Sequence, residues 1–199
     1  MAQLFPGLAL YGFSTALLVR ANLGLDPWDV FHQGAAERTG FSIGVVTIAV
    51  SALVLLLWIP IRQRPGFGTI SNGILVGVFM DASLHIVDAP ETLAVRYGFL
   101  AAGILLNGLA TGLYIGAGLG PGPRDGLMTG LARRGRSIRV VRTSIEVSVL
   151  ALGWLLGGSV GVGTVAYALS IGPLAHVLIP ALTVGESTLS GRPEDHEGN

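Results

Sequence analysis

The sequence predicts an all-α protein: a polytopic membrane helix bundle of six transmembrane helices, arranged as two inverted three-helix repeats, each with a short re-entrant or interfacial helix. Three observations lead to this fold class. Of the 199 residues, 51% are apolar and only 12% are charged, a composition outside the usual range of soluble domains. Six stretches are long and apolar enough to span a bilayer. The second half of the chain also repeats the first.

The six apolar stretches each approach the length of about 20 residues that crosses a hydrocarbon core. They run roughly over residues 4–21, 43–61, 68–84, 97–117, 140–157 and 164–182. Glycine and proline inside them are compatible with membrane helices, because bilayer helices tolerate both and use small residues for close packing. Residues 185–199 are polar and aperiodic, and we expect a disordered tail there.

Residues 1–96 and 97–184 are the two copies of the repeat, and together they form one membrane domain. At an offset of 96 the matched pairs are Gly7 and Gly103, Gly12 and Gly108, Leu17 and Leu113, Ala21 and Ala117, and Gly34 and Gly130. After a one-residue deletion the pairs include Ser42 and Ser137, Gly66 and Gly161, Gly68 and Gly163, Thr69 and Thr164, and Gly77 and Gly172. Apolar residues match by chance, but glycines in register over two whole halves rarely do. The pattern therefore predicts a duplication.

Each copy contains a short helix directly after a glycine-rich break, at residues 27–38 and 123–134. A helix of about 12 residues is about 18 Å long, too short to cross a core of about 30 Å. Asp26 suits the N-cap, Pro27 the first helical position, and Asp29 can reach back to the capping amide. The second copy keeps the proline and the aspartate but has glycine at the cap. These helices either lie in the interface or dip into the membrane and return.

If the short helices do not cross, each copy contributes three spans and the second copy is inverted, as in many secondary transporters. The arginines then divide unevenly between the two faces, and the positive-inside rule puts both termini in the cytoplasm. One face has Arg62, Arg64, Arg124, Arg133, Arg134, Arg136, Arg139, Arg142 and Arg192, and the other has Arg20, Arg38 and Arg96. An eight-crossing arrangement also gives an excess on one side, though a smaller one. Segment length favours six.

The run Leu-Gly-Leu-Asp-Pro-Trp-Asp at residues 23–29, followed by His32-Gln33-Gly34 and by Gly-Phe-Gly-Thr at residues 66–69, resembles the YczE/YitT type of small bacterial integral membrane protein. The resemblance covers nearly all of the chain before the tail. It implies a bacterial cell-membrane protein of this architecture, and it implies no particular substrate or reaction. Arg124 stands where the first copy has Trp28, so a role that needs the aromatic ring belongs to the first copy.

The starts of the short helices are the candidate binding locus. Free amides and the positive end of a helix dipole attract an anion, and Arg124 would strengthen this attraction. The carboxylates at the same places oppose it, so an anionic substrate is only marginally favoured over a cationic or neutral one, and the motif could also be a capping device without a ligand. The candidate substrate-binding residues are Asp26, Pro27, Trp28, Asp29, Pro123, Arg124 and Asp125.

Ionisable residues within or at the ends of spans are candidates for coupling ion movement to transport. Asp81 and His176 occupy equivalent positions near the ends of the third and sixth spans; alternatively they mark helix ends in the headgroup layer. Glu146 lies one turn inside the fifth span, and Arg142 precedes it by four residues. That spacing also fits a local ion pair on one helix face.

The uncharged polar residues within spans are expected to bond between helices rather than to line a path. These residues are Tyr11, Asn72, Asn107, Tyr114 and Tyr167.

The sequence favours a small-solute transporter or permease that works by alternating access between the repeats. The alternatives are a non-transporting subunit or scaffold of a larger membrane complex, and a lipid-handling membrane protein. No hydrolytic, redox, nucleotide-binding or metal-binding pattern is present, so we expect no catalysis, no cofactor and no metal. We expect the lipid bilayer and an unknown small solute as partners, no nucleic acid, and leave oligomerisation open.

Overall fold

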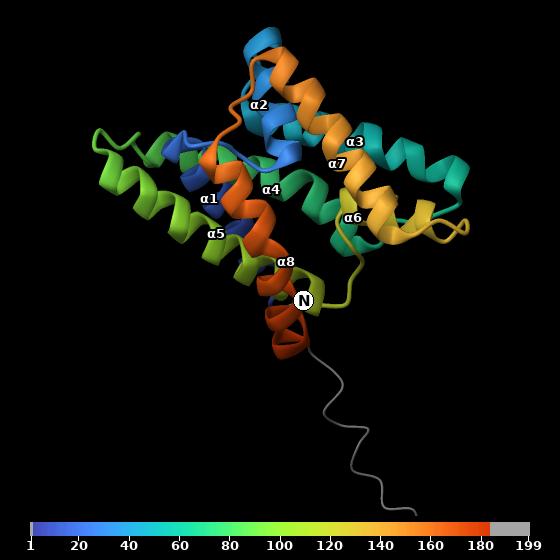
Figure 1. Cartoon of the computed structure of the whole chain (residues 1–199). Helices are drawn as coiled ribbons and strands as arrows, with labels where there is room; N and C mark the ends of the chain where they lie inside the picture. Colours follow the sequence, from blue (N-terminus) through green and yellow to red (C-terminus); the bar gives the residue numbers. More distant parts are fainter. Residues whose placement is uncertain (1, 184–199) are drawn as a thin grey trace, which may run out of the picture.

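The computed structural model describes residues 2–183 of the chain. The predicted tail at residues 185–199 lies outside this range. The helices in the described part are α1 (Leu4–Ala21), α2 (Pro27–Thr39), α3 (Ile43–Ile61), α4 (Phe67–Ile86), α5 (Leu93–Gly116), α6 (Pro123–Ala132), α7 (Ile138–Leu156) and α8 (Val162–Leu182). All six predicted long helices and both short ones are therefore present, and the protein is all-α over the described residues (Figure 1).

Five of the long helices, α1, α3, α4, α5 and α8, are both long enough and apolar enough to cross a membrane. The sixth, α7, has 19 residues, but Arg139, Arg142 and Glu146 lie in it. Charged side chains in a span are costly unless they are paired or face a wet cavity. Composition alone therefore supports a multi-pass membrane protein with five candidate spans.

The starts of the short helices follow from their sequences. The Asp26 side chain accepts hydrogen bonds from the amides of Trp28 at 2.8 Å and Asp29 at 3.0 Å, so the predicted N-cap of α2 is confirmed. The backbone of Gly122, before α6, has nearly the same dihedral angles as Asp26. Because glycine has no side chain, α6 starts without a side-chain cap. The two copies therefore share a backbone turn and differ in its chemistry.

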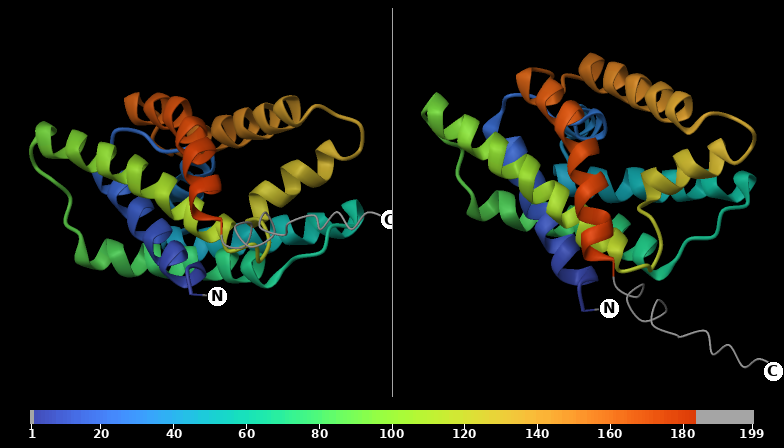
Figure 2. Two further views of the ribbon diagram at one scale, coloured as in Figure 1. Left: turned by 90° about the horizontal axis from the view of Figure 1, so that it is seen from below. Right: turned by 60° about the horizontal axis from the view of Figure 1, so that its bottom comes forward.

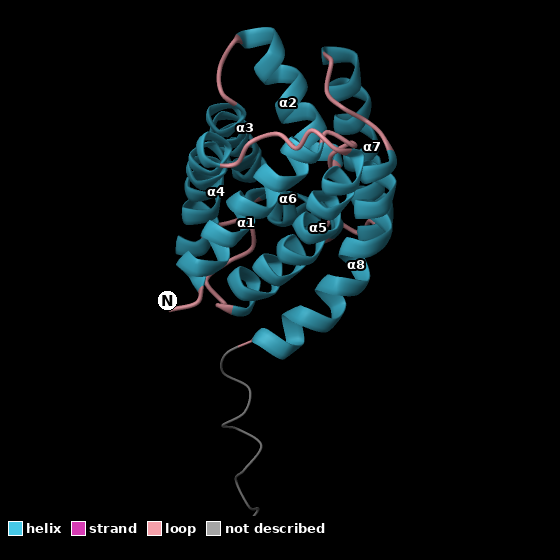
Figure 3. Cartoon of the chain, turned by 90° about the vertical axis from the view of Figure 1, so that its left-hand side faces the viewer, coloured by secondary structure: helices cyan, strands magenta, loops and turns pink. Residues whose placement is uncertain are grey.

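Five of the long helices pack in the order α3, α4, α1, α5 and α8, each against the next, and α7 packs on the short helices. In Figure 3, α3 and α4 lie on one side of the molecule and α7 and α8 on the other. The short helices join the two sides, because α2 packs against α7 and α6 packs against α3. Each short helix thus contacts the third helix of the other copy.

α1 and α5, which are equivalent in the predicted repeat, pack against each other in antiparallel directions. Gly7, near the start of α1, lies against Tyr114, near the end of α5, and Gly103 lies against Leu18, near the end of α1. Small residues at these crossings let the two backbones approach closely.

Contacts between the halves occur in exchanged pairs. The Gly68 amide donates to the Leu119 carbonyl at 2.8 Å, and the Gly163 amide donates to the Leu23 carbonyl at 2.7 Å. Gly68 is equivalent to Gly163, and Leu23 is equivalent to Leu119.

The two halves differ in how their last two helices pack. α3 and α4 lie together, and Gly77 of α4 is buried against Gly44 and Ile48 of α3. α7 and α8 diverge from their connecting turn (Figure 2). Among residues 2–183, nothing packs against a Cβ added at Gly172, the equivalent of Gly77. One side of the bundle is therefore closed and the other is open.

Candidate functional site

Both short helices begin with buried residues, and the chain changes direction at a glycine before each of them. Gly24 has a φ of 103° and Gly120 a φ of 111°, values that side-chain-bearing residues rarely adopt. Gly24 lies against Gly161 and Thr164 of the second half, and Gly120 lies against Gly66 and Thr69 of the first. The turn before each short helix thus packs against the first residues of the last helix of the other half. The Gly24 turn contacts the start of α8, and the Gly120 turn contacts the start of α4.

One pocket is lined by the starts of both short helices. It encloses about 90 Å³, far below the roughly 300–1,000 Å³ typical of sites for drug-sized ligands. Its lining comes from both halves of the chain: Tyr11, Asp26, Pro27, Trp28, Thr47, Ser51, Asn72, Val76, Tyr114, Gly122, Pro123, Arg124, Asp125, Met128, Arg142, Glu146 and Tyr167. Six of the seven candidate binding residues line this pocket, and Asp29 lies directly behind it, bonded to Arg124.

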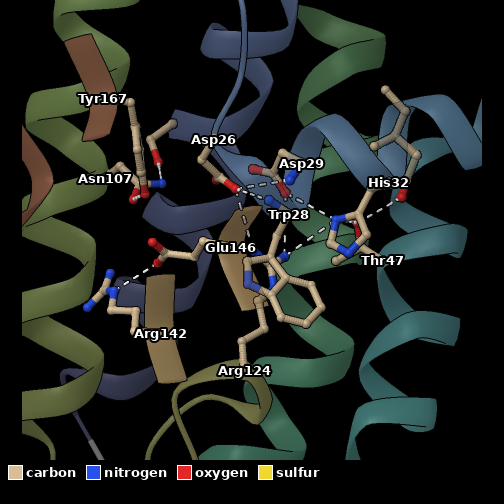
Figure 4. Close-up of polar contacts among 12 residues, drawn as sticks. Asp26, Trp28, Asp29, His32, Thr47, Asn107, Arg124, Arg142, Glu146 and Tyr167 are labelled. Atoms are coloured by element: carbon tan, nitrogen blue, oxygen red, sulfur yellow. Dashed lines mark hydrogen bonds and ion pairs between the residues drawn. The ribbon is translucent and has the colours of Figure 1, made fainter. Parts of the chain in front are cut away.

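Arg124 connects the two short helices. Its Nη2 donates to Asp29 Oδ1 at 3.4 Å, and its Nη1 lies 4.0 Å from Asp26 Oδ1. Its guanidinium carbon lies 5.4 Å from the centre of the Trp28 ring, within the range of a cation–π contact. Figure 4 shows this arginine reaching from α6 toward the carboxylates at the start of α2. The residues that differ between the copies, Trp28 and Arg124, thus face each other.

Asp29 does not reach back to the capping amide as the capping-box pattern predicts. Its Oδ1 lies 3.1 Å from His32 Nδ1, and its Oδ2 has no hydrogen-bond partner within residues 2–183. The Asp26 carboxylate already takes the first amides of α2, so Asp29 is free to bind His32 and Arg124. Asp29 therefore contributes to the candidate site and does not cap α2.

His32 and Thr47 belong to the site, and the sequence analysis missed both. His32 is fully buried, and its Nδ1 lies 3.1 Å from Thr47 Oγ1 and 3.4 Å from Arg124 Nη2. Its spacing of three residues from Asp29 was the available signal, because that spacing puts both on one face of α2. Thr47 lies on α3, and no local pattern in the sequence points to it.

Asp125 is held by a tyrosine of the preceding helix. Tyr114 OH donates to Asp125 Oδ2 at 2.8 Å, and the Tyr114 ring meets the Tyr11 ring edge-on with centroids 6.0 Å apart. The tyrosines therefore line the pocket as well as packing between helices. Asn107 bonds only across the bundle, to Ser14 at 3.0 Å and to Tyr167 at 2.8 Å, as predicted for such residues.

Glu146 and Arg142, both on α7, lie at the exposed edge of the pocket. Arg142 Nε donates to Glu146 Oε1 at 2.8 Å, and the two side chains are 53% and 30% exposed. The local ion pair that their spacing indicates is therefore present. It also lines the pocket, so the pairing does not remove Glu146 from the candidate site.

Asp81 and His176 are not among the residues that line the pocket. The Asp81 carboxylate accepts hydrogen bonds from the Ser42 hydroxyl and the Gly44 amide, and so binds the start of α3. His176 is exposed on α8. The structure does not bring this predicted coupling pair together at the pocket. Over residues 2–183, no three His, Asp or Glu side chains are grouped as a metal site.

The fold and the buried polar pocket define the class: an α-helical multi-pass membrane protein whose broken helices meet at a polar site. The chain belongs to the family of unknown function DUF6198, which it matches over residues 1–180. It is similar to an uncharacterized protein of Haemophilus influenzae, at 44% identity over 86% of this chain and 79% of the relative.

Two further relatives come from Bacillus subtilis. The uncharacterized membrane protein YczE is 32% identical over 88% of this chain and 83% of its own length. The uncharacterized protein YyaS is 24% identical over 87% and 89%. The resemblance drawn from the sequence motifs is thus confirmed. No solved structure matches the chain.

Proposed function

We propose that the protein is a small-solute transporter or permease of six spans, in which two inverted three-helix repeats rock against each other around the pocket. The observation that carries the proposal is that one polar pocket is lined by helix starts from both halves. Broken helices whose starts meet at a site between two repeats are the arrangement of many secondary transporters.

The inverted arrangement is supported by the antiparallel course of α1 and α5 and by the exchanged hydrogen bonds of Gly68 and Gly163. Six spans also require α7 to cross. Its charged residues lie in its first half, where Arg142 and Glu146 pair with each other and border the pocket. Their cost in the membrane falls if they face a wet cavity rather than lipid.

Alternating access is supported by the difference between the two sides of the bundle. α3 and α4 pack against each other, whereas α7 and α8 diverge from their connecting turn. In the proposed second state the roles are exchanged: α7 and α8 close while α3 and α4 part. Gly172 would then pack against Thr143, as its equivalent Gly77 now packs against Ile48.

Transport is tested with the purified full chain in lipid vesicles, with a panel of small charged and neutral solutes and electrical or isotopic detection of flux. We expect protein-dependent flux of at least one solute, reduced at least tenfold by Asp29→Ala or Asp125→Ala. Asp88→Ala, in an exposed loop, is the matched control. Absence of flux for every solute, or unchanged flux in both variants, would reject the proposal.

Rocking is tested with a pair of cysteines, since the chain contains none. Thr143→Cys with Gly172→Cys occupies in the second half the place that Ile48 and Gly77, which are in contact, occupy in the first. We expect this pair to cross-link under oxidation in active vesicles, the cross-link to stop flux, and reduction to restore it. Rocking is excluded if the pair never cross-links while transport proceeds.

A further inference from the structure

The pocket contains more negative than positive charge. Arg142 and Glu146 neutralise each other at the opening. Deeper in the site, Asp26 and Asp29 lie near the guanidinium of Arg124, and a third carboxylate, that of Asp125, also lines the pocket. From this excess we infer that the solute is a small organic cation, such as a protonated amine or a guanidinium group. This inference rests on the proposed function, because it assigns a chemical class to the solute of the same pocket.

Two of the features that would attract an anion, the start of α2 and the guanidinium of Arg124, are already engaged by the protein. The first amides of α2 donate to the Asp26 carboxylate, so that helix start is not free for a ligand. The guanidinium of Arg124 is held between Asp26, Asp29 and the Trp28 ring. The two helix dipoles contribute roughly half a positive charge each, so the three carboxylates outnumber the positive groups of the site. An anion would have to approach these carboxylates.

The lining and the size of the pocket fit an organic cation. Four aromatic residues, Tyr11, Trp28, Tyr114 and Tyr167, line it together with the carboxylates. Aromatic faces attract cations, and desolvated cation–π contacts are stronger than exposed ones. A volume of about 90 Å³ limits the solute to a few heavy atoms. A methylammonium-sized cation meets these conditions.

The test is equilibrium binding to the purified full chain in detergent, measured by titration calorimetry at constant ionic strength. Methylammonium chloride is the cationic probe, sodium formate the anionic probe and sodium chloride the reference. We expect saturable binding of methylammonium and none of formate. Asp125→Asn should weaken methylammonium binding at least tenfold, equal to about 1.4 kcal/mol, whereas Asp88→Asn in the exposed loop should leave it unchanged.

Glu146→Gln at the half-exposed opening is the second variant if Asp125→Asn fails to fold, and it should also weaken methylammonium binding. Saturable binding of formate without methylammonium would overturn the cationic class and leave transport standing. Binding of neither probe would overturn it as well. Methylammonium binding without flux of any solute in vesicles would support the cationic class and reject the transport proposal.

Discussion

Trp58 and its neighbours show how single residues shape the contact between the two halves. The Trp58 ring lies against Gly126 of α6, and its Nε1 donates to the Pro123 carbonyl at 3.0 Å. At the equivalent contact of the other half the sizes are exchanged: Gly153 replaces the tryptophan and meets Val30 and Phe31 of α2. One large and one small residue fill each contact.

This complementarity predicts the effect of a methyl group at Gly126. Alanine favours a helix over glycine by up to about 1 kcal/mol, but at Gly126 it would collide with the Trp58 ring, which is only 1% exposed. We expect Gly126→Ala to reduce the free energy of unfolding by about 1–3 kcal/mol, measured by thermal unfolding in detergent. Gly98→Ala, on α5 with open space around it, should be neutral or stabilising. Equal effects of the two substitutions would contradict the packing argument.

At the scale of elements, the last two helices of each half differ in the group that joins them. Asp81 of α4 accepts hydrogen bonds from Ser42 and Gly44 at the start of α3. The second half has His176 at the equivalent position, exposed on α8. The closed pair of helices therefore has a carboxylate that binds both, which accounts for part of the difference between the two sides.

Removing that carboxylate should loosen α3 at its start. Loss of a hydrogen-bond partner costs about 1–2 kcal/mol, which corresponds to roughly a 5- to 30-fold increase in local opening. In Asp81→Ala we expect faster hydrogen exchange of the first amides of α3, followed by mass spectrometry. His176→Ala should leave exchange in the first turn of α7 unchanged. If the first turn of α3 exchanges at the same rate in Asp81→Ala, the carboxylate does not hold these helices together.

At the scale of the whole molecule, inversion predicts that equivalent loops lie on opposite faces of the membrane. Phe41 and Arg136 are equivalent, and both are exposed just before the third helix of their half. In sealed cells we expect Phe41→Cys to react with a membrane-impermeant maleimide added outside. Arg136→Cys should react only after permeabilisation. Labelling of both from the same face would rule out the inverted arrangement.

The sequence by itself determined the helices, and it predicts the duplication. The long apolar stretches and the Asp-Pro and Gly-Pro starts are local signals, and they predicted α1 and α3 at their observed bounds. It also identified Asp26 as the cap of α2, because capping involves residues only two or three positions apart. Family membership follows from the same motifs.

Only the tertiary structure decided which of these residues share one pocket. Arg124 meets Asp29 across 95 positions, His32 meets Thr47 from another helix, and the coupling candidates Asp81 and His176 do not line the pocket. Such contacts depend on how the helices cross and how deep each break lies in the bundle. Helical periodicity specifies which face a residue occupies but not which helix covers that face.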